Sequence, residues 1–593
     1  MKVPLGSKLK PNADQEKTPG NGRFFVGVIA LSGVLLFSGW MTSIHFLPWT
    51  SWHNEAPVFA AVIILMGVFT KMAFDRGRLP LSVPNVGWPL LLLCAIIVLQ
   101  TVTAQIAFLG DAFVLGFYMI LCLFSLSIGY GAARQSEQGI LSNFPVASSL
   151  AMLLVAGGMF SVLAALVQAL DVWDASGWIV PLQHQRRPGG NIAQTNQLAT
   201  LVLFALASVV YLFETRRLHT VLATLFTLVL ICGLSLTESR SGFLSFFLLA
   251  GWWLVKRHRA GFKLPLAYAG LWIGLFVCCF WFWPSIFSLI QEPGWGTSNS
   301  TFVQVNTSAG LRLVVWPQLW AAAWMHPWFG WGLREVSVAH NAVLHQYSTS
   351  GAFAYAHNLV LDLAVGIGLP LTALLVISAL VWMWRRMRSV SDAQTWYCVA
   401  VALPFGVHSM FEYPFAYAYL LTPVMISVGV LEARLAPGKV VDIPAAIAAG
   451  ILGIAGIVMV WSAIEYISIE EDFRIVRFEA LRVGQTPPDY ERPNIVMLTQ
   501  LGALLDAGRI VPAPNMDSRR IELARKVALR FPWPATLSRY ALSLALNGSP
   551  DEALRQLQVL RVAYGEETYQ IIANDWRSMA DGKYPQLREF FTP

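Results

Sequence analysis

Long apolar runs alternate with short polar segments along most of the 593-residue chain. Thirteen of these runs come close to the length that the hydrocarbon core of a bilayer requires, so each predicts a transmembrane helix. They lie at residues 24–44, 57–73, 87–106, 112–131, 148–169, 197–213, 219–236, 241–256, 264–289, 357–383, 395–411, 416–433 and 443–463. The pattern predicts an all-α polytopic membrane protein.

The polar segments divide the chain into three parts. Residues 1–22 are rich in Lys, Pro, Gly and Asn and are expected to be disordered. Residues 23–463 form the predicted membrane domain, in which residues 290–356 make the longest loop. Residues 464–593 form a polar tail that is expected to be helical.

The tail contains one recognisable pattern. Residues 535–565 predict two amphipathic helices joined by Asn-Gly-Ser-Pro. This pair resembles a single tetratricopeptide-type (TPR-like) hairpin, a unit used for protein contacts. A plain helical cap on the membrane domain is the alternative.

The composition supports a membrane protein and narrows its partners. Hydrophobic residues make up 56% of the chain and charged residues 13%, about half the charged fraction of a soluble domain. The net charge of +7 does not predict a nucleic-acid partner, because the positive residues are divided among short loops and the tail is nearly neutral. All six cysteines fall in apolar runs, which predicts no disulfide framework. The first run is long for a signal-peptide core, so no cleavable signal is expected.

The distribution of Lys and Arg predicts the orientation. With the N-terminus in the cytoplasm, twenty basic residues before residue 464 fall in cytoplasmic segments and five fall on the opposite side. Such an excess of positive charge is typical of cytoplasmic loops. Because thirteen is an odd number of spans, the tail is expected on the outer side.

The five outer positive residues are all arginines: Arg186, Arg187, Arg240, Arg312 and Arg334. A guanidinium presents a planar fork that binds phosphate through two hydrogen bonds. Positive residues are generally concentrated in cytoplasmic loops, so arginines on the outer face indicate a function there. Arg240 stands in the short turn TESRSG, where snorkelling to the membrane surface is the alternative. Arg312 lies on a short interfacial helix predicted within residues 308–333, for which simple anchoring is the alternative.

Polar side chains also gather before the span at 197–213. The segment 184–200 carries four amide side chains at the predicted outer membrane edge: Asn191, Gln194, Asn196 and Gln197. Gly189 and Gly190 permit close backbone approach. This set exceeds what a turn and a helix cap need, although that remains the alternative interpretation.

Titratable side chains mark two further outer positions. His357 is followed by Asn358 and opens the run at 357–383, while His408 and Glu412 lie four residues apart before Pro414. Ionisable groups at membrane depth are functional candidates, and a structural hydrogen bond is the alternative for each histidine. No HExxH or CxxC spacing is present, so no metal site is predicted. Neither a GxSxG elbow nor a phosphate-binding P-loop occurs.

Five motifs in this order resemble the bacterial O-antigen ligase and O-antigen polymerase superfamily. They are GGNIAQTNQ, SRSG, GLRLVVW followed by HPWFGWG, AHNLVLDL, and HSMFEYPFAY, between about residues 180 and 435. The first and last are most similar to the PglL-type protein O-oligosaccharyltransferases.

The resemblance implies a GT-C-type glycosyltransferase of the Gram-negative inner membrane, with its active site and C-terminus in the periplasm. Such enzymes transfer a glycan from undecaprenyl diphosphate. The acceptor in the PglL branch is a Ser or Thr hydroxyl of a protein such as a pilin. In the ligase branch it is lipid A–core, and in the polymerase branch it is another lipid-linked glycan. A transporter of lipid-linked glycans is the alternative from a different class.

The resemblance also assigns residues. It places the essential histidine at His357 and the diphosphate-binding arginines at Arg240 and Arg312; Arg186 and Arg187 are further candidates for binding the donor. The supporting polar residues it implies are Asn191, Gln194, Asn196, Gln197, Asn358, His408, Glu412 and Tyr413. Neither a cofactor nor a metal is implied.

One departure from the family pattern concerns the histidine. Many relatives carry Glu about nine residues after it, where this chain reads Gly366-Ile367-Gly368. His408 and Glu412 are therefore the first candidates for the group that orients His357. A neutral imidazole there is expected to take the proton of the acceptor hydroxyl, with the arginines stabilising the departing diphosphate and inversion at the anomeric carbon.

Overall fold

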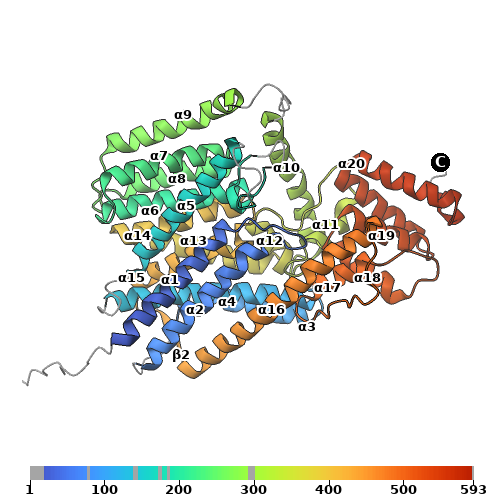
Figure 1. The fold of residues 1–593 in the computed structure, drawn as a ribbon, viewed down its shortest axis with the longest axis horizontal. Coiled ribbons are helices and arrows are strands. Elements are labelled where there is room, and N and C mark those ends of the chain that lie inside the picture. Colours follow the sequence, from blue (N-terminus) through green and yellow to red (C-terminus); the bar gives the residue numbers. More distant parts are fainter. Residues whose placement is uncertain are drawn as a thin grey trace, which may run out of the picture.

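The structure is a computed structural model that describes residues 19–75, 81–137, 145–170, 177–182, 187–290 and 301–590. In this part of the chain, helices account for nearly all of the regular structure (Figure 1). The sheet in it pairs β1 (Leu81–Pro84) antiparallel with β2 (Val440–Ile443), which joins two loops at one end of the bundle.

Within the described residues, nine helices are long and apolar enough to cross a membrane. They are α2 (Trp52–Asp75), α3 (Trp88–Val102) with the short turn η1 (Asn85–Gly87), α4 (Leu109–Glu137), α5 (Val146–Leu170), α6 (Thr195–Glu214), α9 (Leu266–Ile290), α13 (Leu369–Ser389), α15 (Ala418–Leu435) and α16 (Ala445–Leu481). The protein is therefore a multi-pass membrane protein, as the apolar pattern predicts.

Helices also form at the other predicted runs, but the described part of each is not both long and apolar enough to count among these nine. They are α1 (Pro19–Met41), α7 (Thr220–Leu236), α8 (Arg240–Lys256) and α14 (Ala393–Ser409). Every predicted run thus contains a helix, while the count of thirteen spans stays a prediction.

The predicted span 357–383 is not one helix, and that prediction is wrong. The chain forms α12 (Leu359–Ile367), breaks at Gly368 and continues as α13. Gly368 has φ of +83°, and a Cβ there would lie 2.5 Å from the backbone carbonyl of Trp328. Glycine is required because an L side chain meets both the strained φ and the neighbouring backbone. His357 consequently stands before a short helix of its own.

Small residues let the central helices pack closely. A Cβ on Gly129 of α4 would lie 2.1 Å from the carbonyl oxygen of Ile426 on α15, and one on Gly429 would lie equally close to that of Leu126. Such close backbone approach is the usual basis of helix association in membranes. Helix α6 is buried along most of its length, whereas α9 lies at the outer edge of the bundle (Figure 1).

Two helices, α10 (Thr301–Met325) and α11 (Val336–Leu344), lie in the segment that is predicted to be the longest loop. The helix expected within residues 308–333 is therefore present and begins earlier than predicted, while its interfacial position stays a prediction. It ends in the expected Pro/Gly/Trp turn, where Trp328 and Phe329 are 70% and 71% exposed. Large exposed aromatic side chains of this kind are typical of a membrane–water interface.

Helix α16 runs without interruption across residue 464, where the tail was predicted to begin. Its 37 residues extend from the bundle to the C-terminal helices (Figure 1). These helices are α17 (Thr499–Gly508), α18 (Ser518–Arg530), α19 (Pro534–Ala545), α20 (Pro550–Asp581) and the short η4 (Pro585–Phe590). The predicted helix pair at 535–565 is present as α19 and the first half of α20.

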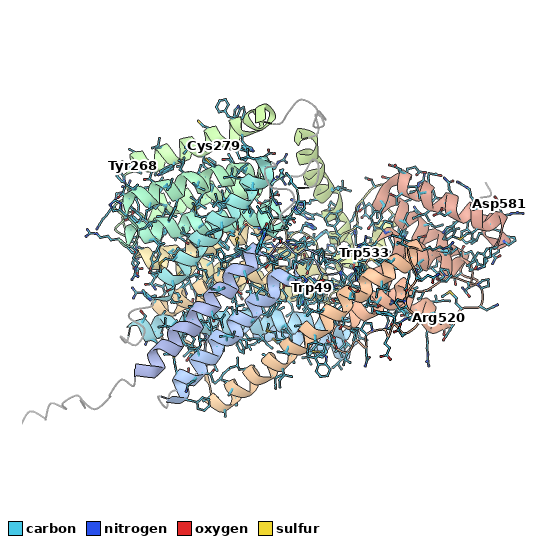
Figure 2. The ribbon with its side chains drawn as sticks, in the orientation of Figure 1. Trp49, Tyr268, Cys279, Arg520, Trp533 and Asp581 are labelled. Carbon is cyan, nitrogen blue, oxygen red and sulfur yellow. The ribbon has the colours of Figure 1, made fainter. Side chains whose placement is uncertain are left out.

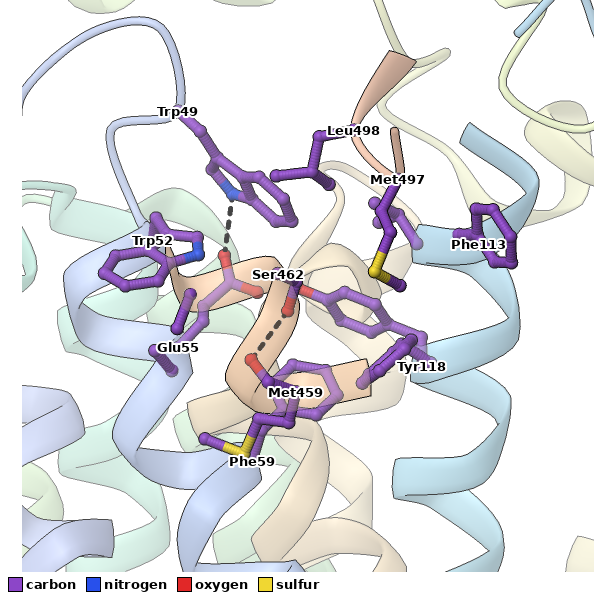
Figure 3. Close-up of a pocket in the computed structure, with 14 residues that line it drawn as sticks. Trp49, Trp52, Glu55, Phe59, Phe113, Tyr118, Met459, Ser462, Met497 and Leu498 are labelled. Atoms are coloured by element: carbon purple, nitrogen blue, oxygen red, sulfur yellow. Dashed lines mark hydrogen bonds between the residues drawn. The ribbon is translucent and has the colours of Figure 1, made fainter. Parts of the chain in front are cut away.

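The C-terminal helices are anchored to the bundle by polar and aromatic contacts. Figure 2 shows Trp49 and Trp533 where the two parts meet, and Asp581 at the far end. The Glu465 carboxylate on α16 accepts hydrogen bonds from the backbone N–H groups of residues 496–498, at 2.8–3.1 Å. A pocket lined by aromatic side chains, among them Trp49 and Trp52, and by Glu55 lies beside this contact (Figure 3).

Candidate active site

The backbone around His357 is fixed by its neighbours on both sides. The Ala356 N–H donates to the carboxylate of Asp362, at 2.8 Å, and the Ala356 carbonyl accepts from the indole N–H of Trp316, also at 2.8 Å. His357 itself adopts φ of +55°. A left-handed conformation is rare for a non-glycine residue and persists only where surrounding contacts enforce it, often at functional sites.

Asn358 explains why the histidine is followed by an amide. Its side-chain oxygen accepts from the Leu361 N–H at 3.0 Å and caps α12, as Asn commonly does at a helix start. Its Nδ2 donates to the Met410 carbonyl at 3.1 Å. Asn358 therefore holds the start of α12 against the end of α14, which brings His357 beside Glu412.

Hydrogen bonding orients the His357 ring. Nδ1 lies 3.0 Å from the carbonyl oxygen of Tyr355, whereas Nε2 lies farther from a carboxylate oxygen of Glu412; both oxygens accept hydrogen bonds, so the shorter contact favours the proton on Nδ1. Nε2 is then left with its lone pair, 3.4 Å from a carboxylate oxygen of Glu412. Phe353 and Tyr413 pack edge-on against the ring, with centroids 4.7 Å away on each side.

Burial keeps this imidazole neutral. Burial, reinforced by the positive charge of Arg312, lowers the pKa of His357 to about 3. The side chain is nonetheless 19% exposed, so it is not completely enclosed. A general base at this position requires a neutral and oriented imidazole.

Glu412 is the hub of the site. Its carboxylate forms an ion pair with Arg312 on α10 and accepts a hydrogen bond of 3.2 Å from the amide of Asn196 on α6. Burial raises the pKa of this carboxyl, and the Arg312 charge opposes that shift. Two helices, α10 and α6, and the His357 loop thus converge on a single carboxylate.

Asn196 connects Glu412 to the turn that contains Arg240, one of the predicted diphosphate-binding arginines. Its side-chain oxygen accepts from the Ser239 hydroxyl at 2.7 Å, and Ser239 in turn caps α8 at the Gly242 N–H, at 3.0 Å. Arg240 is the first residue of α8. The polar contacts from Glu412 through Asn196 therefore set the end of α8 at which Arg240 stands.

Arg187 joins the same neighbourhood. Its guanidinium donates to the carbonyl of Glu238 at 2.7 Å. Burial lowers the pKa of Arg187, and the charges of Arg240 and Arg312 lower it further. The three arginines consequently act on one another electrostatically, as expected for a site that collects anionic charge. Arg186, also predicted here, lies outside the described residues.

The other predicted amides serve the scaffold. Asn191 donates to the carbonyls of Met41 and Trp178, at 2.7 and 2.8 Å. Gln194 caps α6 by accepting from the Gln197 N–H at 2.7 Å, and Gln197 accepts from the Tyr419 hydroxyl. The four amides therefore divide by role, and Asn196 is the one that reaches Glu412.

The two remaining predicted residues are His408 and Tyr413. His408 is buried, with Nδ1 2.8 Å from the Thr200 hydroxyl. Tyr413 stacks on Tyr355, with ring centroids 4.6 Å apart. Of the two candidates for a group beside His357, Glu412 is in contact with it, whereas His408 pairs with α6.

Sequence reasoning missed Tyr355, whose carbonyl sets the tautomer of His357. No side-chain pattern marks a residue that acts through its backbone. Among the residues that the structure describes, no group of three or more His, Cys, Asp and Glu side chains gathers in a way that could hold a metal ion.

Three protein-family models match parts of the chain that contain residues of this site. A protein glycosylation ligase model matches residues 188–213, which include Asn196. An O-antigen ligase model matches residues 225–376, which include Arg240, Arg312 and His357. The C-terminal model of a virulence factor membrane-bound polymerase matches residues 396–578.

Two curated relatives come from Acinetobacter baylyi. A general O-oligosaccharyltransferase is 25% identical over 549 residues, which cover 90% of this chain and 92% of the relative. The chain is homologous to the O-oligosaccharyltransferases. A ComP-specific O-oligosaccharyltransferase is 28% identical over 379 residues, covering 63% of this chain and 66% of that relative. Homology to the first relative extends over both the membrane helices and the C-terminal helices.

Proposed function

We propose that the protein transfers a glycan en bloc from undecaprenyl diphosphate to Ser or Thr hydroxyls of a periplasmic protein such as a pilin. The observation that supports this best is the convergence of an oriented neutral His357, the Glu412 carboxylate and Arg312 in one site. The Gram-negative inner membrane is the proposed location, with this site on the periplasmic side.

The proposed reaction is a direct displacement. Nε2 of His357 takes the proton of the acceptor hydroxyl, whose oxygen forms a bond to the anomeric carbon of the glycan. The bond from that carbon to the diphosphate oxygen breaks, and its electron pair leaves with the lipid diphosphate. The configuration inverts, and the reaction proceeds without a covalent enzyme intermediate, a cofactor or a metal.

Each charged side chain has a part in this step. The imidazolium that forms lies beside Glu412, which stabilises it. Arg240 and Arg187 face the growing charge of the leaving diphosphate, as preorganised donors do in other transferases. A guanidinium has five N–H donors, so Arg312 can hold Glu412 and still contribute to the anionic site.

The test compares two histidine variants of the full-length protein in detergent or nanodiscs. With a lipid-linked glycan and a pilin acceptor, His357→Ala is expected to lower the transfer rate by roughly 10²–10⁴-fold. His258→Ala is the matched control, because His258 is exposed just beyond the opposite end of α8 from Arg240. Transfer by His357→Ala at the control rate would show that the base is misassigned.

A second experiment decides the acceptor. Mass spectrometry of pilin and of lipopolysaccharide from cells with and without the gene should find the enzyme-dependent glycan on protein. A glycan found only on lipid A–core would identify a ligase, and longer glycan chains alone would identify a polymerase. Movement of lipid-linked glycan across vesicles without transfer would identify a transporter.

A further inference from the structure

Arg334 lies between the C-terminal helices and the candidate active site. Its guanidinium covers the face of the Tyr355 ring, with Cζ 4.8 Å from the ring centroid. Its Nε lies 3.7 Å from the Asp111 carboxylate on α4. Arg334 also has φ of +72°, a conformation that needs support from its surroundings.

Tyr355 is held from both sides of its ring. Arg334 covers one part of it, and Tyr413 stacks against it with an interplanar angle of 8°. The Tyr355 carbonyl accepts the Nδ1 proton of His357 at 3.0 Å. The ring contacts of Tyr355 thus add to the hydrogen bond from the Ala356 N–H to Asp362, which belongs to the same peptide plane as the Tyr355 carbonyl.

We infer that Arg334 is a positioning residue for His357 and acts through Tyr355. The inference rests on the proposed function, in which His357 is the base. Arg334 has no contact with the reacting atoms in this scheme. It orients the residue whose carbonyl holds Nδ1–H, so that Nε2 keeps its lone pair toward the acceptor.

The position of Arg334 is itself set from the C-terminal helices. Asp111, which attracts Arg334, is bound through two hydrogen bonds by Arg530 on α18, at 2.7 and 2.8 Å. Contacts thus run from Arg530 through Asp111 and Arg334 to Tyr355 and His357. Correct docking of the C-terminal helices is in this way linked to the orientation of the base.

The chemistry of the contact requires arginine. A planar guanidinium stacks on an aromatic face, whereas a lysine ammonium is a compact point charge. Arg334→Lys keeps the positive charge near Asp111 and removes the stacking plane. Tyr355→Leu keeps the backbone carbonyl and apolar bulk but removes the ring.

The experiment measures kcat, the KM for the lipid-linked donor, and the pH profile of kcat for both variants. Arg561→Lys is the matched control, because Arg561 covers Tyr569 at 5.2 Å in an exposed part of α20. In Arg334→Lys and Tyr355→Leu, kcat is expected to fall roughly 10- to 100-fold, with an unchanged KM for the donor. The control should match the original protein.

The pH profile separates positioning from folding. The other charged or titratable groups facing His357 are Arg312 on α10, Glu412 and Tyr413 after α14, and Asp362 beside Ala356. All of them remain in both variants. A loosened ring gains access to water, so the acidic limb of the kcat profile should move up toward pH 6.5, the ordinary value for histidine.

Three outcomes would overturn the inference. They are an unchanged kcat in both variants, a lowered yield of folded enzyme with an unmoved acidic limb, and an equal loss in Arg561→Lys. The proposed function is judged separately by His357→Ala. An inactive His357→Ala beside a normal Arg334→Lys rejects only the positioning role, whereas an active His357→Ala rejects the base itself.

Discussion

Arg530 on α18 binds both carboxylate oxygens of Asp111 on α4, at 2.8 and 2.7 Å. Both side chains are almost completely buried. The pair joins residues 419 positions apart in the sequence and ties the C-terminal helices to the membrane bundle. A paired buried charge is tolerated, but either partner left alone is strongly destabilising.

Loss of this pair should therefore loosen the junction. Asp111→Asn leaves the Arg530 charge buried without its partner, and the free energy of unfolding should fall by about 3–5 kcal/mol. Thermal unfolding in detergent measures the loss. Glu522→Gln on the same helix α18 is the control, because it breaks an exposed pair with Arg525 that is worth about 0–1 kcal/mol. Equal effects of the two changes would contradict a structural role for Asp111.

Glu412→Gln tests the carboxylate beside the base. The amide can still accept from Asn196, but it cannot stabilise an imidazolium or neutralise Arg312. The value of kcat should fall roughly 10²-fold, measured by transfer to pilin at saturating donor. Glu470→Gln is a matched control, since Glu470 also pairs with a histidine, His53, at 2.8 Å. A normal kcat in Glu412→Gln would leave His357 without its proposed partner.

The pH dependence of transfer follows from the neutral histidine. Because burial and Arg312 lower the pKa of His357 to about 3, the base stays unprotonated between pH 7 and pH 5.5. A histidine of ordinary pKa would lose activity about eightfold over this interval, and this enzyme should keep its rate. Initial rates across the interval decide this, and an acidic limb centred near pH 6.5 would contradict the assignment.

The same shift affects stability with a defined sign. The folded-state pKa of His357 is below the value of 6.5 expected in the unfolded chain, so the unfolded chain binds the extra proton. The contribution of this residue to stability is full above about pH 6.5 and is lost as the pH falls toward 3.

Substitutions of the four amides should have different effects, because Asn196 contacts Glu412 whereas Gln194 caps α6. Asn196→Ala removes a contact to Glu412 and should lower kcat with little change in unfolding temperature. Gln194→Ala removes the cap of α6 and should cost about 1 kcal/mol of stability while kcat stays normal. The test measures kcat and the unfolding temperature of both variants. The reverse pattern of effects would show that the roles of Asn196 and Gln194 are assigned wrongly.

Gly368 should be intolerant of a side chain. Gly368→Ala places a methyl group against the Trp328 backbone and forces a left-handed φ on alanine, so folded protein and activity should both fall. Gly450→Ala on α16 is the control, because open space surrounds its Cβ position and alanine favours helix. Size-exclusion profiles and melting curves measure the difference. A fully stable Gly368→Ala would contradict the strained break between α12 and α13.

Hydropathy was sufficient to predict a helix at every apolar run, because a helix in lipid needs a long apolar sequence whichever other helices it packs against. It could not reveal the break at Gly368, where the apolar run continues through the bend. The carbonyl of Trp328, which packs against Gly368, is what distinguishes this glycine from a glycine inside a helix.

The sequence was enough to predict which residues belong to the candidate site. It was not enough to predict which of them contact one another. Motif resemblance singled out His357, Arg312 and Glu412. The pairing of Arg312 with Glu412 spans 100 positions and depends on how α10 folds back over the bundle. Tyr355 left no signal at all, since its contribution is a carbonyl that every residue possesses.

Helix α16 fixes the height at which the C-terminal helices stand. Its 37 residues form a rod of about 55 Å, of which the hydrocarbon core takes up about 30 Å. Roughly 25 Å of rod then stands clear of the lipid. Under the proposed function, a folded acceptor resting on those helices would be held above the membrane. A loose end or a protruding loop of the acceptor would then have to bring its hydroxyl to the imidazole.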